Sequence, residues 1–434
     1  MSDFDLVVAG GGLSGLMSAI FAARHGKKVL VITRGSGILA IGGGTIDVLG
    51  FLPDGTRLAS PFAGLDRLPA RHPYAIMGAD AVRDALEAFL VLTEEQGFPY
   101  SRNGDDNMPV ITSLGAVKPS YLVPQSMDVR CLAKAKRVHV VGVQGLKDFG
   151  PAFIAGELGR RSDFAGKEIL PSLLASPFTP GRDLSPLDLA RYLDRPDGTA
   201  WLIQRLREQI GEPDAMRPDV VLLPPVLGTR ATPQAHAVVR DGAKLEVCET
   251  VGLPPAVTGL RLHHLLLRLL KKYDVDLIEE SAVTGSYIEN GRCLFLSTNN
   301  DGRGRRYRAK TYIIATGGVL GDGFVVQPDR ALEPIFGLEL PTSPADPGWA
   351  MPHAYPSCVD HDGSASGGAH GFALLGPAVD ARLRPVNNNG KPMCDNVFFV
   401  GKTLGGYDHA GEKSGNGVAI ATAWHAVRQA FAAD

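Results

Sequence analysis

A glycine pattern at the start of the chain most constrains what this sequence can fold into. Three glycines with the spacing Gly-x-Gly-x-x-Gly lie between an apolar segment and a segment of helical periodicity. In a βαβ unit the first glycine permits a tight turn, the second lets the backbone approach a pyrophosphate, and the third lets the helix pack on the strand. The pattern predicts strands over 5–9 and 28–33, a helix over 13–25, and a phosphate site beside the helix start, with an ordinary βα turn as the alternative. The expected contacts are Gly10, Gly12, Leu13, Ser14 and Gly15.

The end of the second predicted strand departs from the usual dinucleotide pattern. Thr33 and Arg34 stand where an acidic residue normally binds the ribose hydroxyls. A cation there suits a phosphate, as in a mononucleotide or a 2′-phosphate, and the alternative is an exposed surface arginine. The sequence therefore does not establish that the bound ligand contains the adenosine half of a dinucleotide. The glycine-rich loop that follows is expected to lie against the ligand through Gly42, Gly43, Gly44 and Thr45.

Two later segments carry further signals. After an antiparallel meander of short strands near 277, 287 and 294, an apolar strand over 312–315 ends in Ala-Thr-Gly-Gly. This order resembles flavoproteins of the glutathione-reductase-type fold, in which such a segment returns beside the N-terminal unit; the alternative is a buried strand that ends in a turn. Near the end, a strand over 396–400 leads through a glycine-rich loop to a helix over 417–431. The positive end of that helix would stabilise negative charge on a reduced flavin. The expected contacts are Thr316, Gly317, Gly318, Gly401, Gly406, Asn416 and Gly417.

Between these segments the apolar pattern alternates strand and helix. It predicts strands over 138–141, 220–223 and 245–248, and helices after Phe149, from Ser185 and over 201–210, followed by a helix over 259–273. Ser185 with Asp188 three residues later is typical of a capped helix start. We expect an α/β fold in which 1–70, 251–335 and 381–434 form a Rossmann-like domain of the glutathione-reductase type. Residues 71–250 would be an inserted α/β domain, and 336–380 a cap on the substrate side.

Composition excludes several classes of function. Lys and Arg total 44 against 46 Asp and Glu, so nothing electrostatic indicates a nucleic-acid partner. The five cysteines lack C-x-x-C spacing, so we expect no metal or iron–sulfur site on this chain. No apolar stretch reaches the ~18 residues of a membrane span, and the chain starts without a signal-peptide pattern. These features predict a cytoplasmic chain without a transmembrane segment.

Several segments together resemble one family along nearly the whole chain. The segments are VVAGGGLSGL with VITRG, GGGTIDVL, KRVHVVGVQGLKDF, GLPPAVTGLRL, IIATGG with EPIFGL, and VFFVGKTLGGYDHAGEKSGNGVA. They resemble the B-subunit family of anaerobic glycerol-3-phosphate dehydrogenases, within the two-dinucleotide-fold flavoproteins. Lys413 and Ser414 stand where cysteine and glycine are common in that family, so the contacts of this loop are expected to differ in detail.

The resemblance implies a role in a complex of three kinds of subunit. This chain and a partner that carries FAD would oxidise sn-glycerol 3-phosphate to dihydroxyacetone phosphate. An iron–sulfur, membrane-associated partner would pass the electrons to quinone in fumarate or nitrate respiration, so this chain would be peripheral on the inner face of the cell membrane. The family assigns FMN to the chain of this type, which agrees with the missing acid near Arg34; FAD is the alternative.

Alcohol oxidation needs a base for the hydroxyl proton and a cation for the phosphate. His409, in the loop expected to face the flavin, is our first candidate for the base, with a locally bonded loop histidine as the alternative. Arg261, in the proline-stiffened GLPPAVTGLRL segment, is the candidate for the phosphate clamp, or it pairs with a carboxylate of the inserted domain. Two rival functions stay open: a flavin electron relay with the alcohol chemistry on the FAD-bearing partner, and an assembly scaffold without cofactor.

Overall fold

The computed structural model describes residues 3–179, 181–211, 219–300, 303–327, 330–340, 371–387 and 389–432. The chain divides into two units. The first comprises 1–38, 46–89 and 266–434, and the second comprises 39–45 and 90–265. The second unit therefore begins and ends later than the expected 71–250 and also takes in the short segment 39–45. Most of the expected cap, 336–380, lies outside the described residues.

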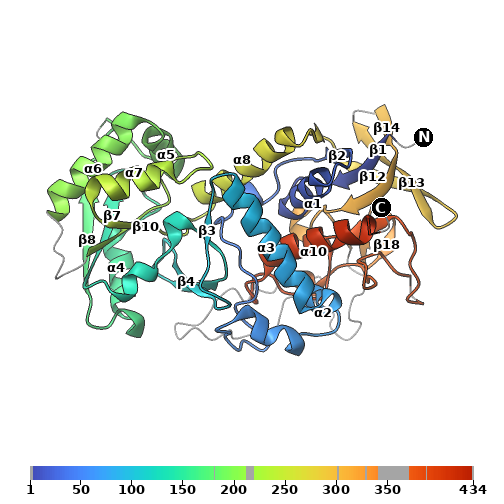
Figure 1. Cartoon of the computed structure of the whole chain (residues 1–434), viewed down its shortest axis with the longest axis horizontal. Coiled ribbons are helices and arrows are strands. Elements are labelled where there is room, and N and C mark those ends of the chain that lie inside the picture. Colours follow the sequence, from blue (N-terminus) through green and yellow to red (C-terminus); the bar gives the residue numbers. More distant parts are fainter. Residues whose placement is uncertain are drawn as a thin grey trace. The chain divides into compact units, whose positions relative to one another are not determined.

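A five-stranded parallel sheet with the order β11-β2-β1-β15-β19 forms the centre of the first unit (Figure 1). In register, Val8 of β1 lies between Val31 of β2 and Ile313 of β15. The inner strands are mostly apolar and buried, and β2 is wholly so, because helices or other chain segments cover both faces of a parallel sheet. Segments far apart in the sequence thus form one Rossmann-like domain, as expected. The strands are β1 (Phe4–Ala9), β2 (Val29–Ile32), β11 (Asp276–Ile278), β15 (Ala309–Ile314) and β19 (Val397–Phe399).

Two helices pack together on this sheet. Helix α1 (Leu13–Arg24) connects β1 to β2, and α10 (Gly415–Ala430) lies against α1, as Figure 1 shows. The rings of Phe21 and Trp424 join them edge to face, 4.9 Å apart. From β1 the chain continues to β2 on one side, whereas β15 and β19 are added on the other side, so the order of strand connection reverses between β1 and β15. Open parallel sheets bind ligands at such switch points.

The remaining elements of the first unit surround this core. An antiparallel meander turns at Asn290-Gly291, where both residues have positive φ angles, as an Asn-Gly hairpin requires. The short strand expected near 277 is β11, which joins the parallel sheet instead of the meander. The other elements are α2 (Pro73–Met77), β12 (Val283–Glu289), β13 (Arg292–Asn300), β14 (Arg303–Tyr307), β16 (Val325–Val326), β17 (Ala331–Glu333), β18 (Leu338–Glu339) and α9 (Gly371–Leu374), together with α3 (Ala79–Glu95), which belongs to the second unit from residue 90 on.

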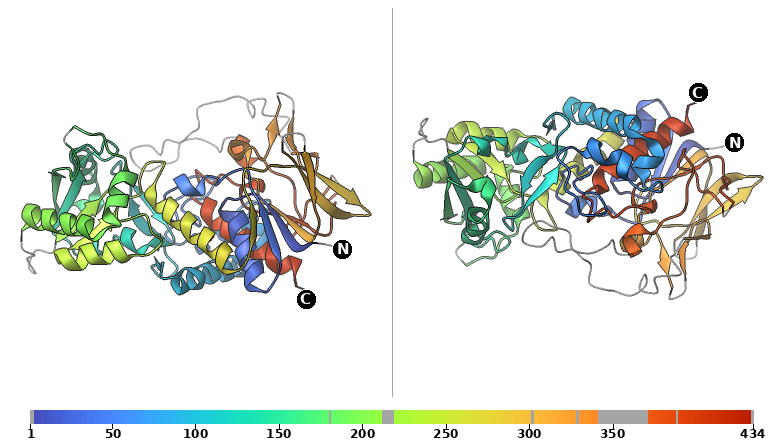
Figure 2. Two further views of the ribbon diagram at one scale, coloured as in Figure 1. Left: turned by 90° about the horizontal axis from the view of Figure 1, so that it is seen from above. Right: turned by 90° about the horizontal axis from the view of Figure 1, so that it is seen from below.

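The second unit has a parallel sheet of its own, with the order β10-β9-β7-β8. Helices α6 and α7 lie side by side on it (Figure 2), and α4 packs against β7 and β8. Helix α5 begins as predicted, because Ser185 and Asp188 form a reciprocal capping box. The elements are β7 (Arg137–Val143), α4 (Pro151–Gly159), β8 (Glu168–Leu174), α5 (Pro186–Leu193), α6 (Pro196–Ile210), β9 (Asp219–Leu223), α7 (Gln234–Ala243) and β10 (Glu246–Glu249).

Smaller elements complete the described chain. Two short antiparallel pairs, β3 with β6 and β4 with β5, belong to the second unit, and helix α8 follows β10. None of the helices in the described part of the chain combines the length and apolar character that a membrane crossing needs. The bounds are β3 (Tyr100–Ser101), β4 (Met108–Ile111), β5 (Val117–Ser120), β6 (Val123–Pro124) and α8 (Val257–Lys272).

Candidate functional site

The three glycines of the N-terminal turn have different reasons to be glycine. Gly10 has φ = 119°, and a Cβ there would collide with the carbonyl oxygen of Ala315 at the end of β15. A Cβ on Gly15 would collide with the carbonyl oxygen of Gly10. Gly12 differs, because no described heavy atom lies within 4 Å of the place where its Cβ would be. Packing therefore explains Gly10 and Gly15, whereas Gly12 leaves room beside the helix start.

The start of α1 is suited to an anion. Gly12 is the N-cap residue, no described side chain caps the helix, and its first turn contains no acidic residue. The helix therefore presents its positive end, including the first-turn residues Leu13 and Ser14, without a neutralising carboxylate. Ser14 also contacts the C-terminal segment, since a Cβ on Gly401 (φ = 63°) would collide with the Ser14 hydroxyl. The N-terminal turn and the C-terminal loop therefore meet at this edge of the sheet.

The Ala-Thr-Gly-Gly segment lies at the same edge. The Gly317 amide donates to Oγ1 of Thr403 at 3.0 Å, and Thr403 belongs to the short 3-10 helix η8 (Gly401–Thr403). Gly318 packs close to the Lys402 side chain. Oγ1 of Thr316 is buried without a hydrogen-bond partner among the described residues. Burying a hydroxyl in this way costs free energy, so Thr316 suits a polar group of a ligand at this edge.

The remaining C-terminal positions show more internal packing. The Gly417 amide donates to the Asp47 carbonyl at 2.9 Å, and a Cβ on Gly417 would collide with the Tyr74 hydroxyl. Gly406 has φ = 84°, and a Cβ there would lie 2.5 Å from the carbonyl oxygen of Arg71. Asn416 lies in the first turn of α10. Packing accounts for both glycines, so a cofactor contact at these positions stays a prediction.

Arg34 is an exposed arginine in a surface ion pair. Its Nη1 lies 2.6 Å from Oδ2 of Asp322, and both side chains are 71% exposed. Thr33 is buried and its hydroxyl donates to the carbonyl of Gly35. The carboxylate of Asp322 neutralises the cation that made a phosphate attractive at this position. The structure therefore supports the alternative weighed for Arg34 and removes the main residue-level argument for a mononucleotide.

The glycine-rich loop expected to cover the ligand belongs to the second unit. The Gly44 carbonyl accepts from the Tyr100 hydroxyl at 2.8 Å, and Oγ1 of Thr45 accepts from Nζ of Lys118 at 2.9 Å. The Gly43 carbonyl accepts from Thr258, and Gly42 packs directly against Gly259 in α8. Gly42, Gly43, Gly44 and Thr45 thus have structural partners within their own unit, and their contact with a ligand stays a prediction.

His409 and Lys402 share the glycine-rich C-terminal loop. Nδ1 of His409 is buried and finds no hydrogen-bond partner in the described part of the protein. Burial, assisted by the Lys402 cation, lowers the pKa of His409, so the imidazole is neutral and able to accept a proton at pH 7. Burial likewise lowers the pKa of Lys402 to about 8. Lys402 donates to the Ala373 carbonyl at 2.6 Å and lies over the Tyr407 ring.

A buried carboxylate fixes this loop. Oε2 of Glu412 accepts from Nε2 of His72 and from the Ser414 hydroxyl, each at 3.1 Å, and Oε1 accepts from the Asp408 amide at 3.0 Å. Nδ1 of His72 accepts from the Tyr74 amide, so the ring hydrogen is on Nε2. Sequence reasoning missed Lys402, Glu412 and His72. The sequence did offer a signal for Lys402 and Glu412, because both are charged residues within a glycine-rich loop. It offered no signal for His72.

Arg261 lies in the second unit and forms a buried ion pair. Its Nη1 and Nη2 contact the two carboxylate oxygens of Glu249 at 2.6 and 2.8 Å, and its Nε donates to the Gly228 carbonyl at 2.7 Å. Burial alone would raise the pKa of Glu249, but the guanidinium and a hydrogen bond from Ser126 hold it below its ordinary value. Pairing with a carboxylate of the inserted domain was the alternative for Arg261. The structure shows that arrangement. No described residue joins Arg261 to form a phosphate site.

Comparisons with known proteins agree with this arrangement. A family model described as an FAD binding domain matches residues 5–354. The protein named as the B subunit of anaerobic glycerol-3-phosphate dehydrogenase in Vibrio vulnificus is 31% identical over 443 residues, covering 99% of this chain and 97% of its own length. Its namesake from Vibrio cholerae is 30% identical over 442 residues, covering 100% and 97%. Among solved structures, 3-ketosteroid Δ1-dehydrogenase from Sterolibacterium denitrificans aligns with a TM-score of 0.43 at 11% identity, covering 99% of this chain and 100% of that chain, too remote to inform function.

Proposed function

Because this chain belongs to the FAD-binding domain family, and within it to the B subunits of anaerobic glycerol-3-phosphate dehydrogenase, we propose that it carries a flavin and oxidises sn-glycerol 3-phosphate to dihydroxyacetone phosphate. The family is one of flavin oxidoreductases, and the name of its members implies a complex of several subunits. In this proposal an FAD-bearing partner shares the complex, and an iron–sulfur, membrane-associated partner takes the electrons on to quinone.

One observation carries the assignment of the flavin site. The start of α1, Thr316 with its unpartnered hydroxyl, and η8 with its neighbour Ser14 meet at the carboxyl edge of the parallel sheet, at the switch point beside β1. This edge offers a positive helix end and a buried polar side chain, which match a flavin's phosphate and its polar groups. The residues present therefore fit the group that the family implies.

We propose FAD as the cofactor, in place of the FMN expected from the sequence. The family model is described as an FAD binding domain. The residue that favoured a mononucleotide, Arg34, is paired with Asp322 at the surface. FMN thus has no support from the comparisons, and the Arg34 cation no longer argues for it.

The bound flavin supplies a two-electron acceptor for the alcohol. The chain's own residues would hold and move the proton. His409 is neutral at pH 7 because its pKa is lowered, so the imidazole could take the proton of the substrate hydroxyl. Lys402, with a pKa of about 8, supplies a cation in the same loop. The Glu412 carboxylate positions this loop through His72 and Ser414.

Cofactor release tests the flavin assignment. The complete complex is purified, its subunits are separated under mild conditions, and this chain is denatured. We expect one equivalent of FAD in the supernatant, identified by its elution and by its fluorescence increase after phosphodiesterase cleavage. FMN in its place would overturn the choice of FAD. A colourless chain from a fully active complex would contradict the flavin assignment and support the scaffold.

The electron relay remains a second candidate because the structure ties Arg261 to Glu249 and leaves no phosphate clamp identified in the described part of this chain. His409→Asn in the intact complex separates the two functions. If this chain oxidises the alcohol, the rate of flavin reduction by sn-glycerol 3-phosphate falls by roughly 10²-fold or more, the usual contribution of a general base. An unchanged rate of reduction would assign the alcohol chemistry to the FAD-bearing partner.

A further inference from the structure

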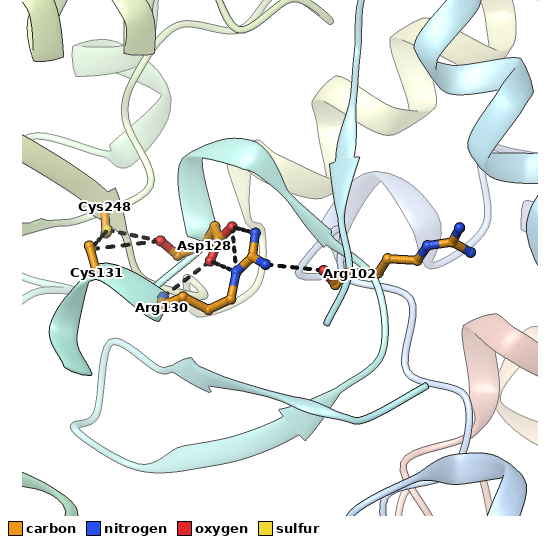
Figure 3. Close-up of polar contacts among 5 residues, drawn as sticks. All are labelled: Arg102, Asp128, Arg130, Cys131 and Cys248. Carbon is orange, nitrogen blue, oxygen red and sulfur yellow. Dashed lines mark hydrogen bonds and ion pairs between the residues drawn. The ribbon is translucent and has the colours of Figure 1, made fainter. Parts of the chain in front are cut away.

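Two cysteines from distant parts of the sequence lie side by side in the second unit. Cys131 belongs to the 3-10 helix η4 (Arg130–Ala133), and Cys248 belongs to β10. Their sulfur atoms are 3.5 Å apart although 117 residues separate them (Figure 3). Cys248 is buried, whereas Cys131 is partly exposed. Contact of two thiols, one of them open to solvent, is the arrangement from which a disulfide can form.

A single backbone carbonyl lies beside both thiols. Both point toward the backbone carbonyl of Asp128, with Sγ of Cys248 at 3.3 Å and Sγ of Cys131 at 4.0 Å from its oxygen. The carboxylate of Asp128 is held by the guanidinium of Arg130, which also donates to the Arg102 carbonyl at 3.2 Å (Figure 3). The Asp128–Arg130 ion pair therefore fixes the turn that carries Cys131, independently of the thiols.

The two thiols have unequal reactivity. The hydrogen bond from Cys248 lowers the pKa of Cys131, and the same interaction together with burial raises the pKa of Cys248. Burial raises the pKa of two other described cysteines, Cys293 to about 12 and Cys394 to about 11. Since the thiolate is the nucleophile, Cys131 is the attacking thiol and Cys248 the resolving one.

We propose that Cys131 and Cys248 form a redox-active dithiol that closes into a reversible disulfide by exchange with a small disulfide such as oxidised glutathione. The Cys131 thiolate attacks one sulfur of that disulfide, forms a mixed disulfide and releases one thiol. The Cys248 thiolate then attacks Sγ of Cys131 and releases the second thiol. The protein loses two electrons and two protons, and the small disulfide gains them as two thiols. Closing a sulfur separation of 3.5 Å to a bond needs a movement of about 1.5 Å.

The bridge would fasten a pocket-lining segment to the sheet. The Ser126 hydroxyl already donates to Glu249, the residue after Cys248, at 2.6 Å. Gln125 and Ser126 line a small pocket in the second unit together with Arg261, whose partner is Glu249. A disulfide from Cys131 to Cys248 would add a covalent link between the same two segments. Oxidation would therefore link the segment that carries Gln125 and Ser126 to β10.

Oxidised glutathione tests the proposal on the full-length chain. The reduced protein is incubated with it at pH 7.5, remaining thiols are alkylated, and peptides are mapped by mass spectrometry without reduction. We expect one cross-linked peptide pair, containing Cys131 and Cys248, that dithiothreitol reopens. The oxidised chain should unfold at higher temperature than the reduced chain, because the bridge closes a long loop. Free alkylation of both cysteines after this treatment would overturn the proposal.

Single variants test the order of the two steps. Cys248→Ser should stop at a glutathione adduct on Cys131, whereas Cys131→Ser should form neither adduct nor bridge. Cys293→Ser, which alters a buried cysteine outside the pair, should form the bridge as the native chain does. In the native chain, alkylation of Cys131 at pH 7 should be roughly tenfold or more faster than that of Cys293. An adduct on Cys248 in the Cys131→Ser chain would contradict the assigned roles, and bridging through Cys293 would contradict the pair itself.

Discussion

At the scale of single residues, the glycines of the N-terminal turn differ in whether the packing of the fold requires them. Gly15 has no room for a Cβ because the carbonyl oxygen of Gly10 occupies that place. Gly12 has open space at its Cβ position and φ = −77°, which any residue adopts. The same motif therefore contains one position at which packing requires glycine and one at which no described neighbour does, where we propose that a ligand approaches.

Gly12→Ala should leave folding intact and weaken flavin binding. The added methyl group meets no described atom, so the free energy of unfolding should change by less than ~1 kcal/mol. It would, however, occupy the space beside the helix start where the phosphate is proposed to lie. Urea unfolding and a fluorescence titration with FAD measure the two effects. The matched variant Gly15→Ala should lose ~1–3 kcal/mol by overpacking. Equal flavin affinity in Gly12→Ala and the native chain would count against this phosphate site.

Arg261 offers a second test at this scale. Arg261→Met would leave the fully buried Glu249 carboxylate without its guanidinium, which costs about 3–5 kcal/mol of unfolding free energy. Paired replacement of both residues, Arg261→Met with Glu249→Leu, should recover much of that loss. Denaturant unfolding of the two variants measures it. If Arg261→Met instead kept its stability and raised only the KM for sn-glycerol 3-phosphate, the phosphate clamp would be restored and the structural role refuted.

At the scale of elements, the capping box of α5 was readable from sequence and can be tested directly. Ser185 accepts from the Asp188 amide at 3.2 Å, and the Asp188 carboxylate accepts from the Ser185 amide at 3.0 Å. Ser185→Ala removes one of these bonds at the helix start and should lower the unfolding free energy by about 1 kcal/mol. Ser185→Thr, which keeps the hydroxyl, is the matched control. A loss of the same size in both variants would show that packing, and not the cap, is responsible.

The sequence predicted elements well wherever local chemistry decides them. The strands beside Gly10 and the capped start of α5 follow from turn and capping residues alone. The partner with which a strand pairs does not follow from local residues. Asp276–Ile278 looked like part of the antiparallel meander, but it pairs with β2, because only tertiary contacts determine which edge accepts a short strand. Helix α3 was missed although Val82, Leu86 and Phe89 are buried at helical spacing.

The candidate site shows the same limit. The glycines and His409 could be named from their motif, since glycine spacing reports backbone geometry locally. Lys402 could not be recognised as buried, and the hydrogen bond from His72 to Glu412 spans 340 residues. The sequence likewise left the partner of Arg261 open, because a cation pairs equally well with a phosphate or with a carboxylate until the fold supplies one of them.

At the scale of the whole molecule, one buried carboxyl couples stability to pH. Glu333 in β17 is inaccessible to solvent and accepts from the amides of Ile335 and Phe336 at 3.0 and 2.9 Å, without a described cation beside it. Burial raises its pKa from 4.5 to about 7. Between these values the folded chain keeps a proton that the unfolded chain loses. The contribution of Glu333 to stability therefore falls as the pH rises through this window.

Glu333→Gln should remove that dependence. The amide stays neutral at every pH, and its oxygen can still accept a backbone hydrogen bond. Above pH 7 the variant should be more stable than the native chain by at most about 3 kcal/mol, the free-energy equivalent of the pKa shift, and the two should converge below pH 4.5. Urea unfolding from pH 4 to 8 measures the difference. Glu339→Gln, at an exposed position on the neighbouring strand β18, should leave the native slope unchanged. A native slope that persists in Glu333→Gln would place the titrating group elsewhere in the chain.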